Sequence, residues 1–171
     1  MSDNDSVSAS PTAMPSLRLM LQSPAHLFSF GFGSGLSPVA PGTAGSLAAL
    51  PCWLLVADQP PWLQLLFIGA GFALGIYCCE RTSRALGVHD HGAIVWDEFV
   101  GQWLCLLFVP TSVIGFALAF VLFRLFDITK PWPVGWVGRR FKGGLGVMLD
   151  DVAAAGYAII VLLLLRYFGV L

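Results

Sequence analysis

The sequence predicts an all-α membrane protein, a polytopic helical bundle of about five membrane-embedded helices with short interfacial helices. The first observation is composition, because 57% of the 171 residues are hydrophobic and only 11% are charged. This is too little polar surface to cover a soluble globule of this size. The second is pattern: the apolar residues form runs bounded by Pro, Gly or charge, without the period-two alternation of barrel strands.

Each apolar run is interpreted as one helix. A spanning helix needs about 20 apolar residues, so these runs are short for crossing a bilayer. In the first run Pro51 removes a backbone hydrogen bond, and a re-entrant or kinked segment is the alternative to a full span. The predicted helices cover residues 43–57, 62–77, 93–109, 112–126 and 152–169.

The chain before the first run is divided into a tail and an entry segment. Residues 1–17 are Ser-rich and lack the basic start and cleavage site of a signal peptide, so they are predicted to be a disordered tail. Residues 26–32 are expected to form a short, half-buried helix. Residues 18–171 are interpreted as a single helical membrane domain.

Basic residues predict the orientation, because cytoplasmic connections of membrane proteins are rich in Lys and Arg. Arg18 precedes the first run, and Arg81 and Arg84 follow the second. The segment between the fourth and fifth runs is also basic, whereas the connections around Asp58 and Pro110 carry no basic residue. The basic ends are therefore predicted to face the cytoplasm.

Six of the ten acidic residues fall near these predicted cytoplasmic ends. Carboxylates at the edge of hydrocarbon are costly and are expected to face protein or trapped water. An ion path would continue across the bilayer, but the middles of all five runs lack acidic residues. The six are Asp90, Asp97, Glu98, Asp127, Asp150 and Asp151.

The motif WDEFVG sets Asp97 and Glu98 side by side, about one turn inside the third predicted helix. Adjacent helical residues point about 100° apart, so the two carboxylates can line one cleft. The simpler alternative is a structural salt bridge to Arg124 or Lys130.

The motif FRLFDITKPWP ends the fourth predicted helix. Arg124 and Asp127 lie three residues apart on one helical face, and Lys130 follows after three more. Two cations and a carboxylate at this spacing can together hold a phosphate and the metal that bridges it. Trp132 and Trp136 are interpreted as interfacial anchors.

The motif GGLGVMLDD predicts a flexible Gly-rich turn before the fifth helix. Asp150 and Asp151 would then meet the positive end of the helix dipole. Helix capping alone explains one of these acids. It does not explain two acids that occur together with four others near the same predicted cytoplasmic ends. Hard oxygen ligands of this kind suit Mg²⁺ or Mn²⁺.

Two further motifs are candidates for phosphate and proton chemistry. GSGLSPVAPGTAGS leads into the first helix through Thr43, a good N-cap, and the freed backbone N–H groups form a possible anion site. A close-packed helix entry explains the same residues equally well. In HDHG, His91 is either a general acid or metal ligand, or an ordinary loop residue.

Four motifs in register closely resemble bacterial phosphatidylglycerophosphatase A. The resemblance covers most of the chain from Pro24 onward. It implies a Mg²⁺-dependent enzyme of the bacterial inner membrane that removes the terminal phosphate of phosphatidylglycerophosphate to give phosphatidylglycerol. The motifs read GFGSGLSPVAPGTAGS, HDHGAIVWDEFVG, FRLFDITKPWPV and GGLGVMLDD.

On this interpretation the membrane domain is a lipid phosphatase whose site faces the cytoplasm at headgroup level. The alternatives are a small divalent-cation transporter using the same carboxylates, and a structural subunit that docks a partner. Nucleic-acid binding has no support, and the oligomeric state, the number of metal ions and the nucleophile stay open. The predicted metal ligands are Asp97, Glu98, Asp127, Asp150 and Asp151; the catalytic residues are Asp97, Asp127, Lys130 and His91; and Arg124, Lys130, Thr43 and Ser46 contact the phosphate.

Overall fold

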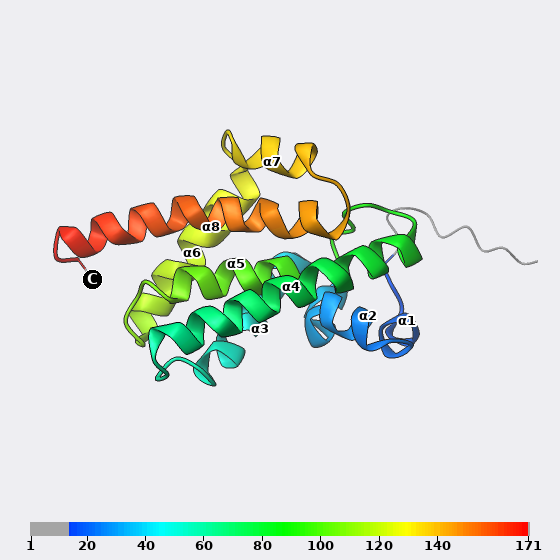
Figure 1. Ribbon diagram of the computed structural model, residues 1–171, viewed down its shortest axis with the longest axis horizontal. Helices are drawn as coiled ribbons and strands as arrows, with labels where there is room; N and C mark the ends of the chain where they lie inside the picture. The colour runs from blue at the N-terminus through cyan, green and yellow to red at the C-terminus, as the bar shows by residue number, and fades with distance from the viewer. Residues whose placement is uncertain (1–13, 171) are drawn as a thin grey trace, which may run out of the picture.

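The computed structural model describes residues 14–170, and every regular element in that range is a helix (Figure 1). The all-α prediction is confirmed for this part of the chain. Most of the predicted tail lies outside the described residues. The helices are α1 (Leu17–Leu21), α2 (Pro24–Ser29), η1 (Gly31–Leu36), α3 (Pro41–Leu54), α4 (Pro61–Leu86), α5 (Trp96–Leu106), α6 (Val113–Thr129), α7 (Val134–Arg140) and α8 (Gly143–Tyr167).

Two helices, α4 and α8, dominate the molecule and run antiparallel to each other (Figure 1). They have 26 and 25 residues and are long and apolar enough to cross a membrane. At a rise of about 1.5 Å per residue, both exceed the roughly 30 Å of a hydrocarbon core. These two helices indicate association with a membrane.

The prediction of about five membrane-embedded helices is supported in part. All five predicted runs contain a helix, but α3, α5 and α6 have only 14, 11 and 17 residues. At the same rise they are shorter than the hydrocarbon core. Within residues 14–170, therefore, only α4 and α8 meet the length and apolarity of a span.

The short helix α5 is the centre of the bundle. It packs against α3, α4, α6 and α8, and its aromatic residues Phe99 and Trp103 are fully buried. It begins at Trp96, later than predicted, because the preceding residues bond elsewhere. The Val95 N–H donates to the Ser29 carbonyl at 2.8 Å. An irregular buried segment therefore leads directly into the acidic first turn.

Helix α3 begins earlier than predicted, which removes Thr43 from the N-cap position. The cap residue is Ala40, in the left-handed region at φ 47°, and Pro41 occupies the first turn. A residue before proline is kept out of the right-handed helical region, whereas Pro itself suits the first helical position. Pro51 lies inside α3 without ending it.

Helix α8 also begins earlier than predicted, at Gly143, so the expected Gly-rich turn is helical. A Cβ at Gly144 would collide with the Ile76 carbonyl oxygen of α4. Glycine therefore permits the close crossing of α4 and α8, as small residues do in membrane bundles. As a result Asp150 and Asp151 lie about two turns inside α8 and do not cap it.

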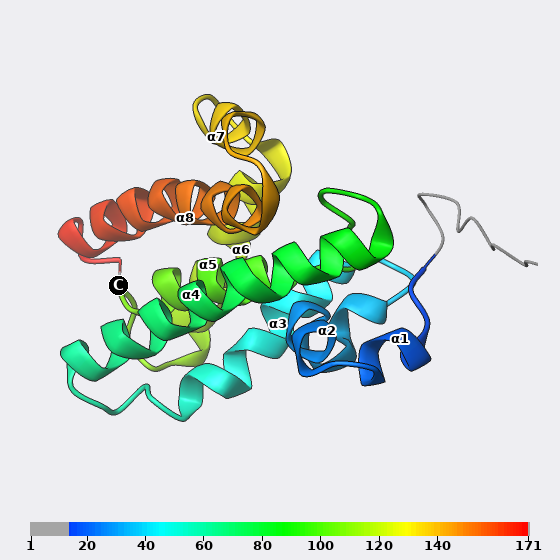
Figure 2. The same ribbon diagram turned by 45° about the vertical axis from the view of Figure 1, so that its right-hand side comes forward.

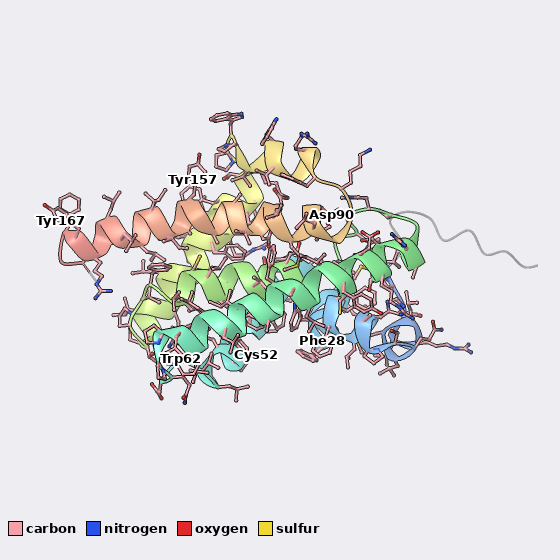
Figure 3. The ribbon with its side chains drawn as sticks, in the orientation of Figure 1. Phe28, Cys52, Trp62, Asp90, Tyr157 and Tyr167 are labelled. Atoms are coloured by element: carbon pink, nitrogen blue, oxygen red, sulfur yellow. The ribbon has the colours of Figure 1, made fainter. Side chains whose placement is uncertain are left out.

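Helix α7 lies on the outer side of α8, away from α4 (Figure 2). It packs against α8, and it exposes Trp136 together with Trp132 from the turn before it. Trp62 and Tyr167 mark one end of the long axis, and Asp90 lies toward the other (Figure 3). The second end is where the polar side chains described next gather.

Candidate active site

Three carboxylates from two helices converge inside the bundle. Asp97 and Glu98 come from the first turn of α5, and Asp151 comes from α8. One oxygen from each lies within 4.8 Å of the others. Asp97 and Asp151 are buried, and the Glu98 side chain is 12% exposed. The structure thus brings together acids that are more than 50 residues apart in sequence.

This cluster has too few partners for its charge. Asp97 Oδ1, Glu98 Oε2 and Asp151 Oδ2 are buried and make no hydrogen bond within the described residues. A buried ionised carboxylate without a partner is strongly unfavourable. Three hard oxygen donors at this separation are the kind of set that binds Mg²⁺. The residues present therefore fit a divalent cation.

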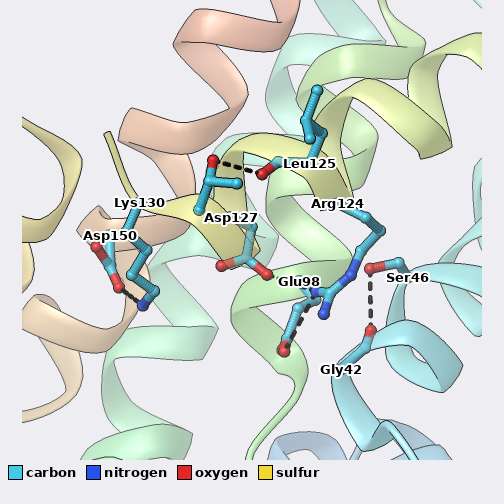
Figure 4. Close-up of polar contacts among 9 residues, drawn as sticks. Gly42, Ser46, Glu98, Arg124, Leu125, Asp127, Lys130 and Asp150 are labelled. Atoms are coloured by element: carbon cyan, nitrogen blue, oxygen red, sulfur yellow. Dashed lines mark hydrogen bonds and ion pairs between the residues drawn. The ribbon is translucent and has the colours of Figure 1, made fainter. Parts of the chain in front are cut away.

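Arg124 connects the cluster to a fourth carboxylate. Its Nη1 donates to Asp127 Oδ2 at 2.6 Å and lies 3.8 Å from Glu98 Oε1 (Figure 4). Arg124 and Asp127 share one face of α6, as their spacing predicts. The structural salt bridge to Arg124, which was the simpler alternative for the two acids of α5, is thus present for Glu98. Within residues 14–170, neither Asp97 nor Asp151 forms an ion pair.

The N-terminal turn of α3 closes this side of the site. A Cβ at Gly42 would contact Glu98 Oε1 and would lie 3.0 Å from Nη2 of Arg124. Only a glycine leaves room for the carboxylate and the guanidinium against the α3 backbone. The positive end of the α3 dipole therefore lies beside Glu98.

Lys130 ends α6 and turns back toward α8. It is the left-handed C-cap, at φ 41°, and its ammonium group forms an ion pair with Asp150 (Figure 4). Burial alone would lower the pKa of Lys130, but the hydrogen bond to Asp150 and the nearby charges of Asp151 and Asp127 raise it. Lys130 therefore stays cationic at neutral pH.

A polar pocket of about 270 Å³ opens beside the Lys130–Asp150 pair. Asp150 lines this pocket and is followed directly in α8 by Asp151, which belongs to the buried cluster. The pocket therefore lies beside the part of α8 that carries the buried cluster residue Asp151. Its other lining residues include His89, Asp90, Gly138 and Gly146.

Three residues predicted to act in the site do not line the pocket. His91 is buried, and its Nδ1 accepts a hydrogen bond from the Ala93 N–H at 3.1 Å, which stabilises the turn before α5. The Ser46 hydroxyl donates to the Gly42 carbonyl of its own helix at 3.0 Å. For Thr43, no side-chain hydrogen bond is present within residues 14–170. The structure does not bring these three into the pocket.

Several residues that shape the site carry little sequence signal. Gly138 lies so close to Asp150 that a Cβ there would be 3.0 Å from its carboxylate. Glu80 accepts a hydrogen bond from the Gly144 N–H at 2.7 Å and so caps α8. Glycine in a helical segment hints at a close approach, but the partner of that approach is visible only in three dimensions.

Fold and site together define a membrane-associated helical protein with a buried acidic cluster flanked by two cations, an arrangement suited to phosphate chemistry. The family model for phosphatidylglycerophosphatase A matches residues 27–166. The chain belongs to this family, and it is a phosphatase enzyme. The resemblance that the motifs indicated is confirmed. The same family match favours an enzyme over a cation transporter.

Curated relatives agree with this assignment. Phosphatidylglycerophosphatase A of Escherichia coli K12 is 49% identical over 138 residues, which cover 80% of each chain. The Haemophilus influenzae protein of the same name is 44% identical over 155 residues, covering 90% of this chain and 95% of the relative. A Bacteroides thetaiotaomicron relative, provisionally named a phosphatidylinositol-3-phosphatase, is 40% identical over 149 residues, covering 82% and 92%. No solved structure shows a significant match.

Proposed function

We propose that this protein hydrolyses phosphatidylglycerophosphate to phosphatidylglycerol and inorganic phosphate, as a Mg²⁺-dependent enzyme of the bacterial inner membrane. The names of the Escherichia coli and Haemophilus influenzae relatives support the substrate. The third relative is named for another phospholipid that carries a phosphate monoester on its headgroup. All three names thus share the cleavage of such a monoester.

The observation that carries the proposal is the convergence of Asp97, Glu98 and Asp151. Their oxygens lie within 4.8 Å of one another, and each carboxylate keeps a buried oxygen without a partner. We assign the Mg²⁺ to these three residues, with Asp127 and Asp150 next to them. When bound, such an ion polarises a phosphoryl oxygen and lowers the pKa of a coordinated water.

The residues of the chain itself bind and orient the substrate. Lys130 lies in the polar pocket and offers a fixed positive charge to the phosphate oxygens as charge develops on them. Arg124 holds Glu98 and Asp127 in place through its two ion pairs. The burial of Arg124, Glu98 and Asp127 excludes bulk water from their ion pairs and strengthens them.

The topology follows from the charges at the two ends of the bundle. In the proposed arrangement α4 and α8 cross the membrane in opposite directions, and the shorter helices are embedded between them. Arg81, Arg84 and Lys142 then lie on the cytoplasmic side, with the pocket at headgroup level. A diacyl lipid could present its terminal phosphate there while its acyl chains stay in the bilayer.

The direct test is phosphate release from phosphatidylglycerophosphate in detergent micelles by the purified protein. We expect Mg²⁺ to be required, so chelation should abolish activity and added Mg²⁺ should restore it. Asp97→Asn and Asp151→Asn, each tested singly, should lower kcat/KM by about 100-fold or more. Removing a ligand charge weakens the metal site without changing the side-chain shape.

The matched control is Asp58→Asn, which changes an exposed acid in the connection between α3 and α4. It should leave activity unchanged. Full activity of both Asp97→Asn and Asp151→Asn would overturn the assigned site. Activity that persists in the presence of a chelator would overturn the requirement for a metal ion. Absence of phosphate release from the lipid would overturn the substrate.

A further inference from the structure

We propose that the polar pocket binds the free hydroxyl of the headgroup glycerol, through Asp90 and His89. Both residues line the pocket together with Lys130 and Asp150. The inference rests on the proposed function. It adds the groups that distinguish this substrate from other phosphate monoesters.

His89 offers a hydrogen-bond donor. Its Nε2 lies 2.6 Å from the Gly143 backbone nitrogen, whose N–H can only donate. Nε2 must therefore carry no proton, and in the neutral ring the proton is on Nδ1. This bond also fixes the ring at the start of α8. Nδ1 has no hydrogen-bond partner among the described residues, so it remains available to a ligand.

Asp90 lines the same pocket and offers an acceptor. It is exposed in the connection between α4 and α5, and its carboxylate makes no ion pair in the described part of the chain. A hydroxyl group both donates and accepts, so it can bond the Asp90 carboxylate and His89 Nδ1 together. A phosphate oxygen carries no proton to donate and would be repelled by Asp90. Asp90 and His89 together therefore favour a hydroxyl.

Lys130 and Asp150, which line the same pocket, favour the phosphate. Lys130 supplies a positive charge. Asp150 is 7% exposed, and its Oδ1 has no partner, which marks a polar contact left for a ligand or its metal. The pocket thus combines a cation with a hydroxyl site, as a terminal phosphate and the glycerol that bears it require.

The surroundings match the rest of the headgroup. At about 270 Å³ the pocket is smaller than the roughly 300–1,000 Å³ of sites for larger ligands, so it suits a short polar group. An adjoining depression shares His89 and Gly138 with the pocket and adds Lys142. Lys142 supplies a positive charge there that can contact the phosphodiester joining the glycerol to the lipid.

The test compares two substrates that differ by one oxygen atom. The first is phosphatidylglycerophosphate, and the second is its deoxy analogue, in which a propane-1,3-diyl unit replaces the glycerol. For the unmodified protein in micelles, we expect kcat/KM to be about 10-fold higher for the natural lipid. In Asp90→Ala this preference should fall toward 1, because the hydroxyl keeps only its bond with His89 and the deoxy analogue never used the carboxylate.

Asp58→Ala is the matched control and should keep the full preference, since Asp58 lies at the opposite end of α4. Asp90→Asn is a second variant in case Asp90→Ala does not fold, and it should show a reduced preference. Equal rates on the two lipids in the unmodified protein would overturn the inference, as would an unchanged preference in both Asp90 variants. If neither lipid is hydrolysed, the proposed function itself fails.

Discussion

Gly42 illustrates how the site depends on single close contacts. A Cβ at this position would contact both Glu98 and the Arg124 guanidinium. The sequence shows a glycine near a helix start, which is a common pattern with many causes. The carboxylate and cation that require it come from α5 and α6, so their proximity could not be predicted from local sequence.

We expect Gly42→Ala to lower kcat/KM by about 100-fold, because displacing Glu98 or Arg124 by even 1 Å misplaces the catalytic groups. The measurement is phosphate release, with thermal unfolding in detergent recorded alongside. Gly156→Ala is the control, because a Cβ there meets nothing within 4 Å. Equal activity of the two variants would contradict a role for the α3 turn in the site.

The presence of a carboxylate cluster was predictable, because an ionised carboxylate is unfavourable in an apolar environment. Asp97, Glu98 and Asp151 are expected to face protein and not lipid. Because all three lie near the same predicted ends of their helices, they are also expected to lie close together. Their separate roles were not predictable. His91 has the right chemistry for proton transfer, yet it bonds the backbone of its own turn. Residue type therefore indicates which reaction is possible, and only packing decides which residue reaches the substrate.

The first turn of α8 is held by side chains from α4 and its following loop. Glu80 accepts from the Gly144 N–H and also forms an ion pair with Arg84 at 2.7 Å. These contacts set the position of α8, and therefore of Asp150 and Asp151 further along it. A carboxylate at a helix N-terminus is favourable for both hydrogen bonding and the dipole.

We expect Glu80→Ala to lower the free energy of unfolding by about 1 kcal/mol, the usual value of a lost helix cap. Arg84→Ala removes the exposed ion pair but keeps the cap, so it should change stability by less than about 0.5 kcal/mol. Thermal unfolding of the purified variants measures both. A larger loss in Arg84→Ala than in Glu80→Ala would show that the ion pair, and not the cap, matters.

Helix boundaries were less predictable than helix existence. All five apolar runs are helical, but α8 starts at Gly143 although its first turn contains three glycines. Glycine has poor helix propensity, so the local sequence favours a turn there. Packing against α4 and the Glu80 cap overcome that preference. Conversely, residues 93–95 are apolar enough for a helix, but they bond to neighbouring segments instead.

The arrangement of the whole molecule yields a topology that can be measured. Lys142 is the N-cap of α8, and Asp58 lies just before α4. Because α4 and α8 run antiparallel, these two positions lie at opposite ends of the helix pair (Figure 1). If the protein sits in the membrane as proposed, these two positions face opposite compartments.

We expect Asp58→Cys to react with a membrane-impermeant maleimide in intact cells, and Lys142→Cys to react only after the membrane is permeabilised. The background should carry serine at the four native cysteines, which are Cys52, Cys78, Cys79 and Cys105. The measured quantity is the labelled fraction of each variant. The reverse pattern would overturn the orientation, and equal labelling of both in intact cells would overturn the crossing.

The enclosure of α5 has a consequence for the lipid around the protein. Helices α3, α4, α6 and α8 pack against this short helix, so in the proposed membrane arrangement they would separate its charged first turn from the acyl chains. In that arrangement the bilayer would not need to thin or admit water in order to accommodate the carboxylates. A protein arranged in this way would catalyse a reaction of strongly polar groups at membrane depth while its lipid-facing surface stays apolar.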